Sequence, residues 1–171
     1  MNPANHLIIV TDPDSPFDRE CRAKRYFVIN ANPHVGGRFS VLSAFGLVPA
    51  AAMGIDVASF LKEAQSAAAT FTQSDSPALQ LAAAILQSNN QILSMSDRGS
   101  SVPGLADWIE QLIAESTGKE GVGYLPIALP SLQSPSAGDG LRIAFHADVG
   151  ASIVVHATLA EHFILWEWAT A

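Results

Sequence analysis

Residues 7–16 read LIIVTDPDSP and residues 26–30 read YFVIN, and these two stretches decide the fold class. Residues 7–11 and 26–30 are short runs of apolar residues rich in isoleucine and valine, as in β-strands. The Asp/Pro/Ser-rich residues 12–16 end the first run with a loop signal. Two buried strands joined by a short crossover predict a parallel sheet rather than a hairpin.

The rest of the chain alternates between helix and strand patterns. Helices are predicted from Arg38 to Val48, from Pro103 to Gly118 and from Thr158 to the end. Two more have a capping signal: one starts at the N-cap Asp56 and ends near residues 70–75, and one covers residues 78–88 after Ser76 and Pro77. Strands are predicted at residues 91–96, 124–129, 141–146 and 152–156, with a loop at 131–140. This alternation predicts an α/β fold with a largely parallel sheet flanked by helices.

The composition excludes several classes of ligand and location. With 9 Lys and Arg against 16 Asp and Glu, the net charge is −7, which disfavours nucleic acid. The longest apolar stretches, residues 45–55 and 81–86, are too short to span a membrane, and residues 1–10 do not resemble a signal peptide. A single cysteine, Cys21, fits a reducing compartment. We therefore expect a cytoplasmic protein that binds neither nucleic acid nor membrane.

The first candidate site is the segment VGGRFS at residues 35–40. Gly36 and Gly37 form a tight turn through which a ligand can approach the backbone closely. Arg38 and Ser40 then lie near a helix N-terminus, where donors favour an anion such as a phosphate or an oxyanion. The alternative is an ordinary turn with a surface arginine, and spacing alone does not exclude it.

The second candidate site is on the helix that follows Pro103. Gln111 and Glu115 are four residues apart and project from one side, at the edge of the apolar stripe near Trp108. A carboxylate there can be partly desolvated, which suits a general base. A solvated glutamate is the alternative. His146 and His156 end two predicted strands and could line a site or simply lie at the sheet edge, and the histidines show no metal-ligand spacing.

Two motifs resemble glucose-6-phosphate isomerase (phosphoglucose isomerase). VGGRFSVLSAFGL at residues 35–47, followed by AMGID at 52–56, resembles the family's first signature, and WIEQLIAESTGK at 108–119 resembles the second. Residues 159–171 are similar to the helix before the family's final segment. The resemblance implies one three-layer domain of the sugar isomerase (SIS) type over residues 1–171. We expect it to be truncated at both ends and to come from a compact bacterial or transaldolase-fused isomerase.

The resemblance also implies an activity and residue roles. Such enzymes interconvert glucose 6-phosphate and fructose 6-phosphate through a cis-enediol, without metal or organic cofactor. Glu115 matches the base that moves a proton between C2 and C1, Arg38 the cation that stabilises the enediolate, and Gln111 a substrate contact. Gly36, Gly37 and Ser40 are the other expected substrate-binding residues.

Three features of the family are not found in this sequence. They are the Ser/Thr-rich phosphate loop, the ring-opening histidine and the C-terminal catalytic lysine. We therefore expect the isolated chain to be inactive, and the apolar last helix predicts a homodimer or a self-associating chain. Two alternatives remain open: a non-catalytic SIS module that binds a sugar phosphate, and a packing domain without a ligand.

Overall fold

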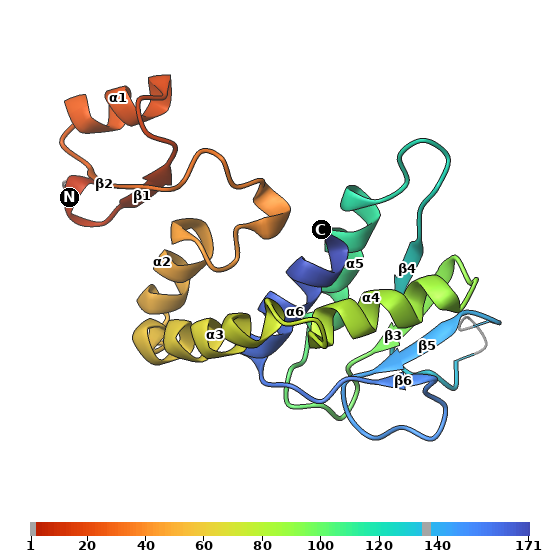
Figure 1. Cartoon of the computed structure of the whole chain (residues 1–171). Coiled ribbons are helices and arrows are strands. Elements are labelled where there is room, and N and C mark those ends of the chain that lie inside the picture. The colour runs from red at the N-terminus through yellow and green to blue at the C-terminus, as the bar shows by residue number, and fades with distance from the viewer. Residues whose placement is uncertain (1–2, 135–137) are drawn as a thin grey trace. The chain divides into compact units, whose positions relative to one another are not determined.

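The computed structural model describes residues 3–134 and 138–171, and the chain divides into two compact units (Figure 1). Unit 1 comprises Met1–Leu61 and unit 2 comprises Lys62–Ala171. Each unit has its own parallel sheet. The predicted fold class, α/β with parallel strands and flanking helices, is confirmed, whereas a single domain over residues 1–171 stays a prediction.

Unit 1 is built on two short parallel strands, β1 (Ile8–Thr11) and β2 (Phe27–Asn30), in the register Ile8↔Phe27. The predicted parallel pairing is confirmed. The prediction that both strands are buried is wrong, because Ile8 is 52 % and Phe27 61 % exposed. A sheet of two strands is too narrow to bury its large side chains on both faces.

The crossover between β1 and β2 contains a helix that we did not predict, α1 (Pro16–Ala23). Ser15 caps it by accepting a hydrogen bond from the backbone N–H of Asp18 at 3.0 Å, and Pro16 occupies the first helical turn. Cys21 is buried on its inner face. Helix α1 therefore makes β1 and β2 a complete βαβ unit.

The helix predicted from Arg38 to Val48 is wrong in its bounds. A short 3₁₀ helix, η2 (Gly37–Phe39), comes first, and α2 (Ala44–Ala52) begins only after Ser43, whose hydroxyl accepts from the N–H of Phe45 at 3.2 Å. Pro49 lies inside α2 and does not end it. Helix α2 starts six residues later than predicted. Pro49 removes one backbone hydrogen bond from it, and the Ser43 cap at its N-terminus stabilises the helix.

Helix α3 (Val57–Phe71) begins as predicted at Asp56, whose carboxylate accepts from the N–H of Ser59 at 3.1 Å and from its hydroxyl at 2.7 Å. These hydrogen bonds from Ser59 lower the pKa of Asp56. The boundary between the two units falls within α3.

Unit 2 contains a four-stranded sheet in which every neighbouring pair is parallel. Its strands, each within a predicted one, lie in the order β4-β3-β5-β6, with bounds β3 (Ile92–Ser96), β4 (Leu125–Ala128), β5 (Leu141–Ala144) and β6 (Ile153–Val154). Of the predicted loop at 131–140, residues 135–137 lie outside the described residues.

Three helices complete unit 2: α4 (Pro77–Gln87), α5 (Leu105–Ser116) and α6 (Leu159–Thr170). Helix α5 packs on β4 and on α6, and α6 packs on α4. The core of unit 2 includes side chains that are at most 1 % exposed: Leu93, Met95, Ile109, Leu112, Leu132, Ile143 and Trp166. The apolar face predicted for α5 is thus its buried face.

One predicted cap differs in the structure. Ser76 precedes α4 as predicted, but its hydroxyl makes no capping hydrogen bond. The side chain is instead turned into the interior, where its Oγ has no hydrogen-bond partner among the described residues.

None of the helices in residues 3–134 and 138–171 is long and apolar enough to cross a membrane.

Candidate active site

Residues 32–40 of unit 1 form a series of tight hydrogen-bonded turns. The side chain of Asn32 accepts from the N–H of His34 at 2.9 Å and starts the first turn. The N–H of Phe39 then donates to the carbonyl of Gly36 at 3.0 Å, and the hydroxyl of Ser40 donates to the carbonyl of Gly37 at 2.7 Å. The turns therefore place the predicted residues 36–40 together.

The glycines of this segment are not required by the fold. Gly36 has φ −64° and ψ 151°, which other residues adopt readily, and Gly37 begins the 3₁₀ helix without a positive φ. A Cβ at either position would meet none of the described atoms within 4 Å. The predicted tight turn is present, but its backbone does not require glycine at either position, so close approach of a ligand remains a reason for the pair.

Gln111 and Glu115 lie on α5 of unit 2, and the structure brings them into contact. Nε2 of Gln111 donates to Oε1 of Glu115 at 3.1 Å. Both side chains are exposed, so the expected partial desolvation of Glu115 is not found in this chain. The pair presents a carboxylate, oriented by a neighbouring amide, to any molecule bound at this face.

Two carboxylates that sequence reasoning missed fix the position of α5. Oε2 of Glu110 accepts from the backbone N–H of Ala128 at the end of β4, at 2.7 Å. Oδ2 of Asp97 accepts from the N–H of Ala106 in the first turn of α5, at 3.2 Å. Their partners are 18 and 9 residues away in the sequence, so no local pattern could reveal them. These contacts set the direction in which Gln111 and Glu115 project.

The two histidines singled out by the sequence have different surroundings. His146 lies beside Gly99, where an added Cβ would come within 3.2 Å of Nε2, and its buried Nδ1 has no hydrogen-bond partner among the described residues. His156 lines a cavity of about 570 Å³ between α3, α4 and β6. In the described part of the chain, no cluster of three or more His, Cys, Asp or Glu could hold a metal.

The predicted site residues fall into two groups. Gly36, Gly37, Arg38 and Ser40 belong to unit 1, whereas Gln111 and Glu115 belong to unit 2. Each group is assembled within its own unit. Their chemistry differs: the first offers a cation on a glycine-rich turn, and the second offers a carboxylate with an amide.

The chain is similar to bacterial glucose-6-phosphate isomerases. It is 40 % identical to that of Symbiobacterium thermophilum over 55 % of this chain and 22 % of the relative. It is 35 % identical to that of Rubrobacter xylanophilus over 70 % of this chain and 29 % of the relative. It is 37 % identical to that of Carboxydothermus hydrogenoformans over 67 % of this chain and 26 % of the relative. The chain thus spans less than a third of the length of these curated relatives, and no family model matches it.

Among solved structures, a hypothetical protein of Thermus thermophilus is similar, with a TM-score of 0.70 and 27 % identity over 81 % of this chain and 38 % of that one. Fold and sequence together define an α/β protein of the SIS type. The resemblance that the two motifs predict is confirmed: the chain is a relative of glucose-6-phosphate isomerase over part of that protein's length.

Proposed function

We propose that this chain is part of an enzyme that interconverts glucose 6-phosphate and fructose 6-phosphate. The observation that carries the proposal is the contact between Gln111 and Glu115, which orients a carboxylate within a motif resembling the isomerase signature. Relatives named glucose-6-phosphate isomerase support it. Binding of a sugar phosphate alone would not need a base at this position.

In the proposed reaction, Glu115 removes the proton from C2 of the open-chain aldose. The electron pair of the C2–H bond forms the C1–C2 double bond, and negative charge develops on the oxygen of C1. Arg38 stabilises this charge as an electrostatic partner. Glu115 then returns the proton to C1, the hydroxyl proton on the C2 oxygen moves to the C1 oxygen, and a ketone remains at C2.

The other residues bind and orient the sugar phosphate. Gln111 holds the carboxylate of Glu115 and contacts substrate, and Gly36 and Gly37 leave room for the substrate beside the backbone. The hydroxyl of Ser40 donates to the carbonyl of Gly37, so its remaining acceptor capacity is what it offers a sugar hydroxyl. We place the reaction in cytoplasmic glycolysis and gluconeogenesis, and self-association through exposed apolar residues of α6 such as Trp168 belongs to the same proposal.

The test is isomerase activity of the protein expressed from its whole gene, with fructose 6-phosphate as substrate and glucose 6-phosphate formation as the readout. Turnover that the Glu115→Gln variant loses supports the proposal. Binding of fructose 6-phosphate without any turnover would instead favour a non-catalytic sugar-phosphate module. The absence of both binding and turnover would contradict both functions.

A further inference from the structure

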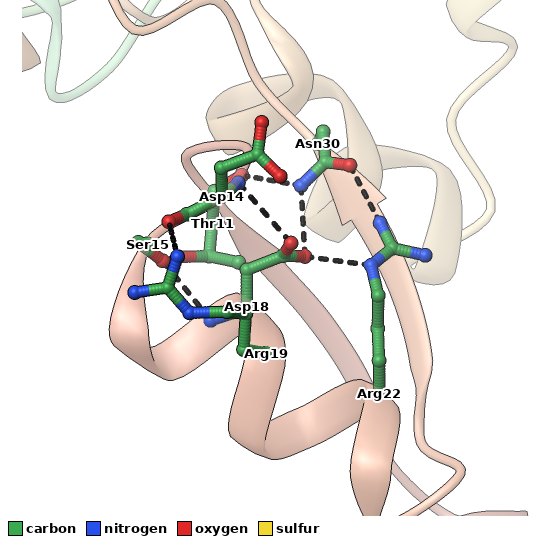
Figure 2. Close-up of polar contacts among 7 residues, drawn as sticks. All are labelled: Thr11, Asp14, Ser15, Asp18, Arg19, Arg22 and Asn30. Carbon is green, nitrogen blue, oxygen red and sulfur yellow. Dashed lines mark hydrogen bonds and ion pairs between the residues drawn. The ribbon is translucent and has the colours of Figure 1, made fainter.

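A polar network ties the carboxyl ends of the two strands of unit 1 to helix α1 (Figure 2). At its centre is the carboxylate of Asp18, a residue only 4 % exposed. Its Oδ1 accepts from Nε of Arg22 at 2.9 Å and from Nδ2 of Asn30 at 3.1 Å, and its Oδ2 accepts from the N–H of Asp14 at 3.2 Å. A buried carboxylate with three donors is a strongly specified arrangement.

Asn30, the last residue of β2, joins three parts of this network. Its Nδ2 donates to Asp18 and also to the carbonyl of Thr11, the last residue of β1, at 3.3 Å. Its Oδ1 accepts from Nη2 of Arg22 at 2.6 Å. The hydrogen bond from Asn30 is the main cause that lowers the pKa of Asp18, so Asp18 stays ionised and remains an acceptor.

The segment that carries Arg38 starts directly after Asn30. Ala31 is buried and its N–H donates to the carbonyl of Thr11 at 3.0 Å, and the turn at Asn32 follows. At its other end the segment leads into α2, which packs on β1. Both ends are thus held on the same two-stranded sheet, and the polar network holds the first.

We propose that Asn30 is a positioning residue of the isomerase site: its side chain fixes the start of the segment that presents Gly36, Gly37 and Arg38. This inference rests on the proposed function. Asn30 does not touch the substrate; it acts through the backbone of residues 31–37. The short sheet of β1 and β2 buries few apolar side chains that could hold this segment. The directional hydrogen bonds of Asn30 therefore anchor it to the sheet.

The first arm of the test needs no activity. Amide hydrogen exchange is measured in the 171-residue chain for wild type, Asn30→Ala and Arg19→Ala. Arg19 is the matched control, because its guanidinium donates to the carbonyl of Asp14 at 2.8 Å and leaves the bonds of Asn30 intact (Figure 2). Asn30→Ala should raise exchange over residues 34–40 about tenfold or more, because hydrogen bonds to a charged group are lost. Unchanged exchange there, or an equal rise in Arg19→Ala, would overturn the proposal.

A swap of donor and acceptor distinguishes these hydrogen bonds from packing. Asn30→Asp keeps the shape but sets a carboxylate against Asp18, so it should raise exchange at least as much as Asn30→Ala. Combining it with Asp18→Asn returns a donor opposite an acceptor and should restore part of the protection. No recovery in the double variant would show that the pair acts by packing alone, which contradicts the proposal.

The second arm uses the protein expressed from its whole gene. Because Arg38 is proposed to act on the transition state, Asn30→Ala should lower kcat about tenfold with a much smaller change in KM, and Arg19→Ala should leave both unchanged. Faster exchange with normal kcat would overturn the positioning role. If the wild-type protein has no isomerase activity, the proposed function fails, while the exchange arm still decides whether Asn30 anchors the segment.

Discussion

Gln111 donates a hydrogen bond to the carboxylate of Glu115 across one turn of α5, with Nε2 and Oε1 3.1 Å apart. The hydrogen bond restricts the rotation of a side chain that is exposed to solvent. The contacts of Glu110 and Asp97 with the backbone hold the helix itself. The direction in which this pair projects thus depends on two carboxylates that precede it in the chain.

Replacing Glu115 by Gln should abolish proton transfer in the protein expressed from its whole gene. A positioned general base contributes about 10²- to 10⁴-fold to the rate, and glutamine cannot accept the proton. We expect kcat to fall by that factor in a coupled assay, with little change in the unfolding midpoint. Glu63→Gln, on the exposed face of α3, is the control and should keep full activity. Near-normal turnover in folded Glu115→Gln would show that another group is the base.

Arg38→Lys should affect the transition state more than substrate binding. Charge develops on the enediolate only during the reaction, and an ammonium cannot reproduce the planar, two-pronged guanidinium. We expect a lower kcat with a KM close to that of wild type. A variant that loses affinity for fructose 6-phosphate but keeps its kcat would identify Arg38 as a phosphate clamp instead.

An added methyl group should weaken ligand binding at Gly36 and lower the stability of the protein at Gly46. At Gly36 a Cβ meets none of the described atoms, so Gly36→Ala should fold with unchanged stability and bind fructose 6-phosphate more weakly. At Gly46 a Cβ would lie 2.0 Å from the carbonyl oxygen of Val41, so Gly46→Ala should destabilise the protein by about 1–3 kcal/mol. Urea unfolding and calorimetric titration measure the two effects. Equal loss of stability in both variants would contradict the assignment of Gly36 to ligand approach.

The sequence predicted the elements whose signals are local. Apolar runs with β-branched residues located β1, and the capping carboxylate of Asp56 located the start of α3. The helix after Ser15 and Pro16 was missed although these residues carry the same signal that located α4 after Ser76 and Pro77. The error came from reading residues 12–16 as loop alone.

What the sequence could not predict depends on contacts between distant residues. The order β4-β3-β5-β6 places β3, the first strand of unit 2, inside the sheet, and no periodicity encodes that. The bonds of Asn30 to Thr11 and Asp18 span 19 and 12 residues. Of the candidate site, the spacing of Gln111 and Glu115 predicted that the two side chains project from one side of α5, whereas their hydrogen bond and their exposure are known only from the structure.

Two groups on α6, the buried imidazole of His162 and the half-buried carboxyl of Glu167, should give unit 2 opposing pH dependences. Burial lowers the pKa of His162 from its usual 6.5 to about 4 and raises the pKa of Glu167 from its usual 4.5 to about 7. Both side chains have a buried atom without a hydrogen-bond partner among the described residues. Between pH 4 and 6.5 the unfolded chain binds the proton of His162 more readily, so that group's contribution to stability is lost as the pH falls. Between pH 4.5 and 7 the folded chain binds the proton of Glu167 more readily, so its contribution is lost as the pH rises.

In the wild-type chain the two pH dependences of the free energy of unfolding offset each other between about pH 4.5 and 6.5, and a single variant should reveal each of them. Glu167→Gln should leave a free energy of unfolding that increases with pH from about 4 to 6.5. His162→Leu should leave one that decreases from about pH 4.5 to 7. Urea unfolding of the three proteins at half-unit steps from about pH 4 to 8 measures the difference, and the wild-type curve serves as the common reference for all other titrating groups. Curves that stay parallel over this range would show that neither side chain titrates in the folded state as its burial requires.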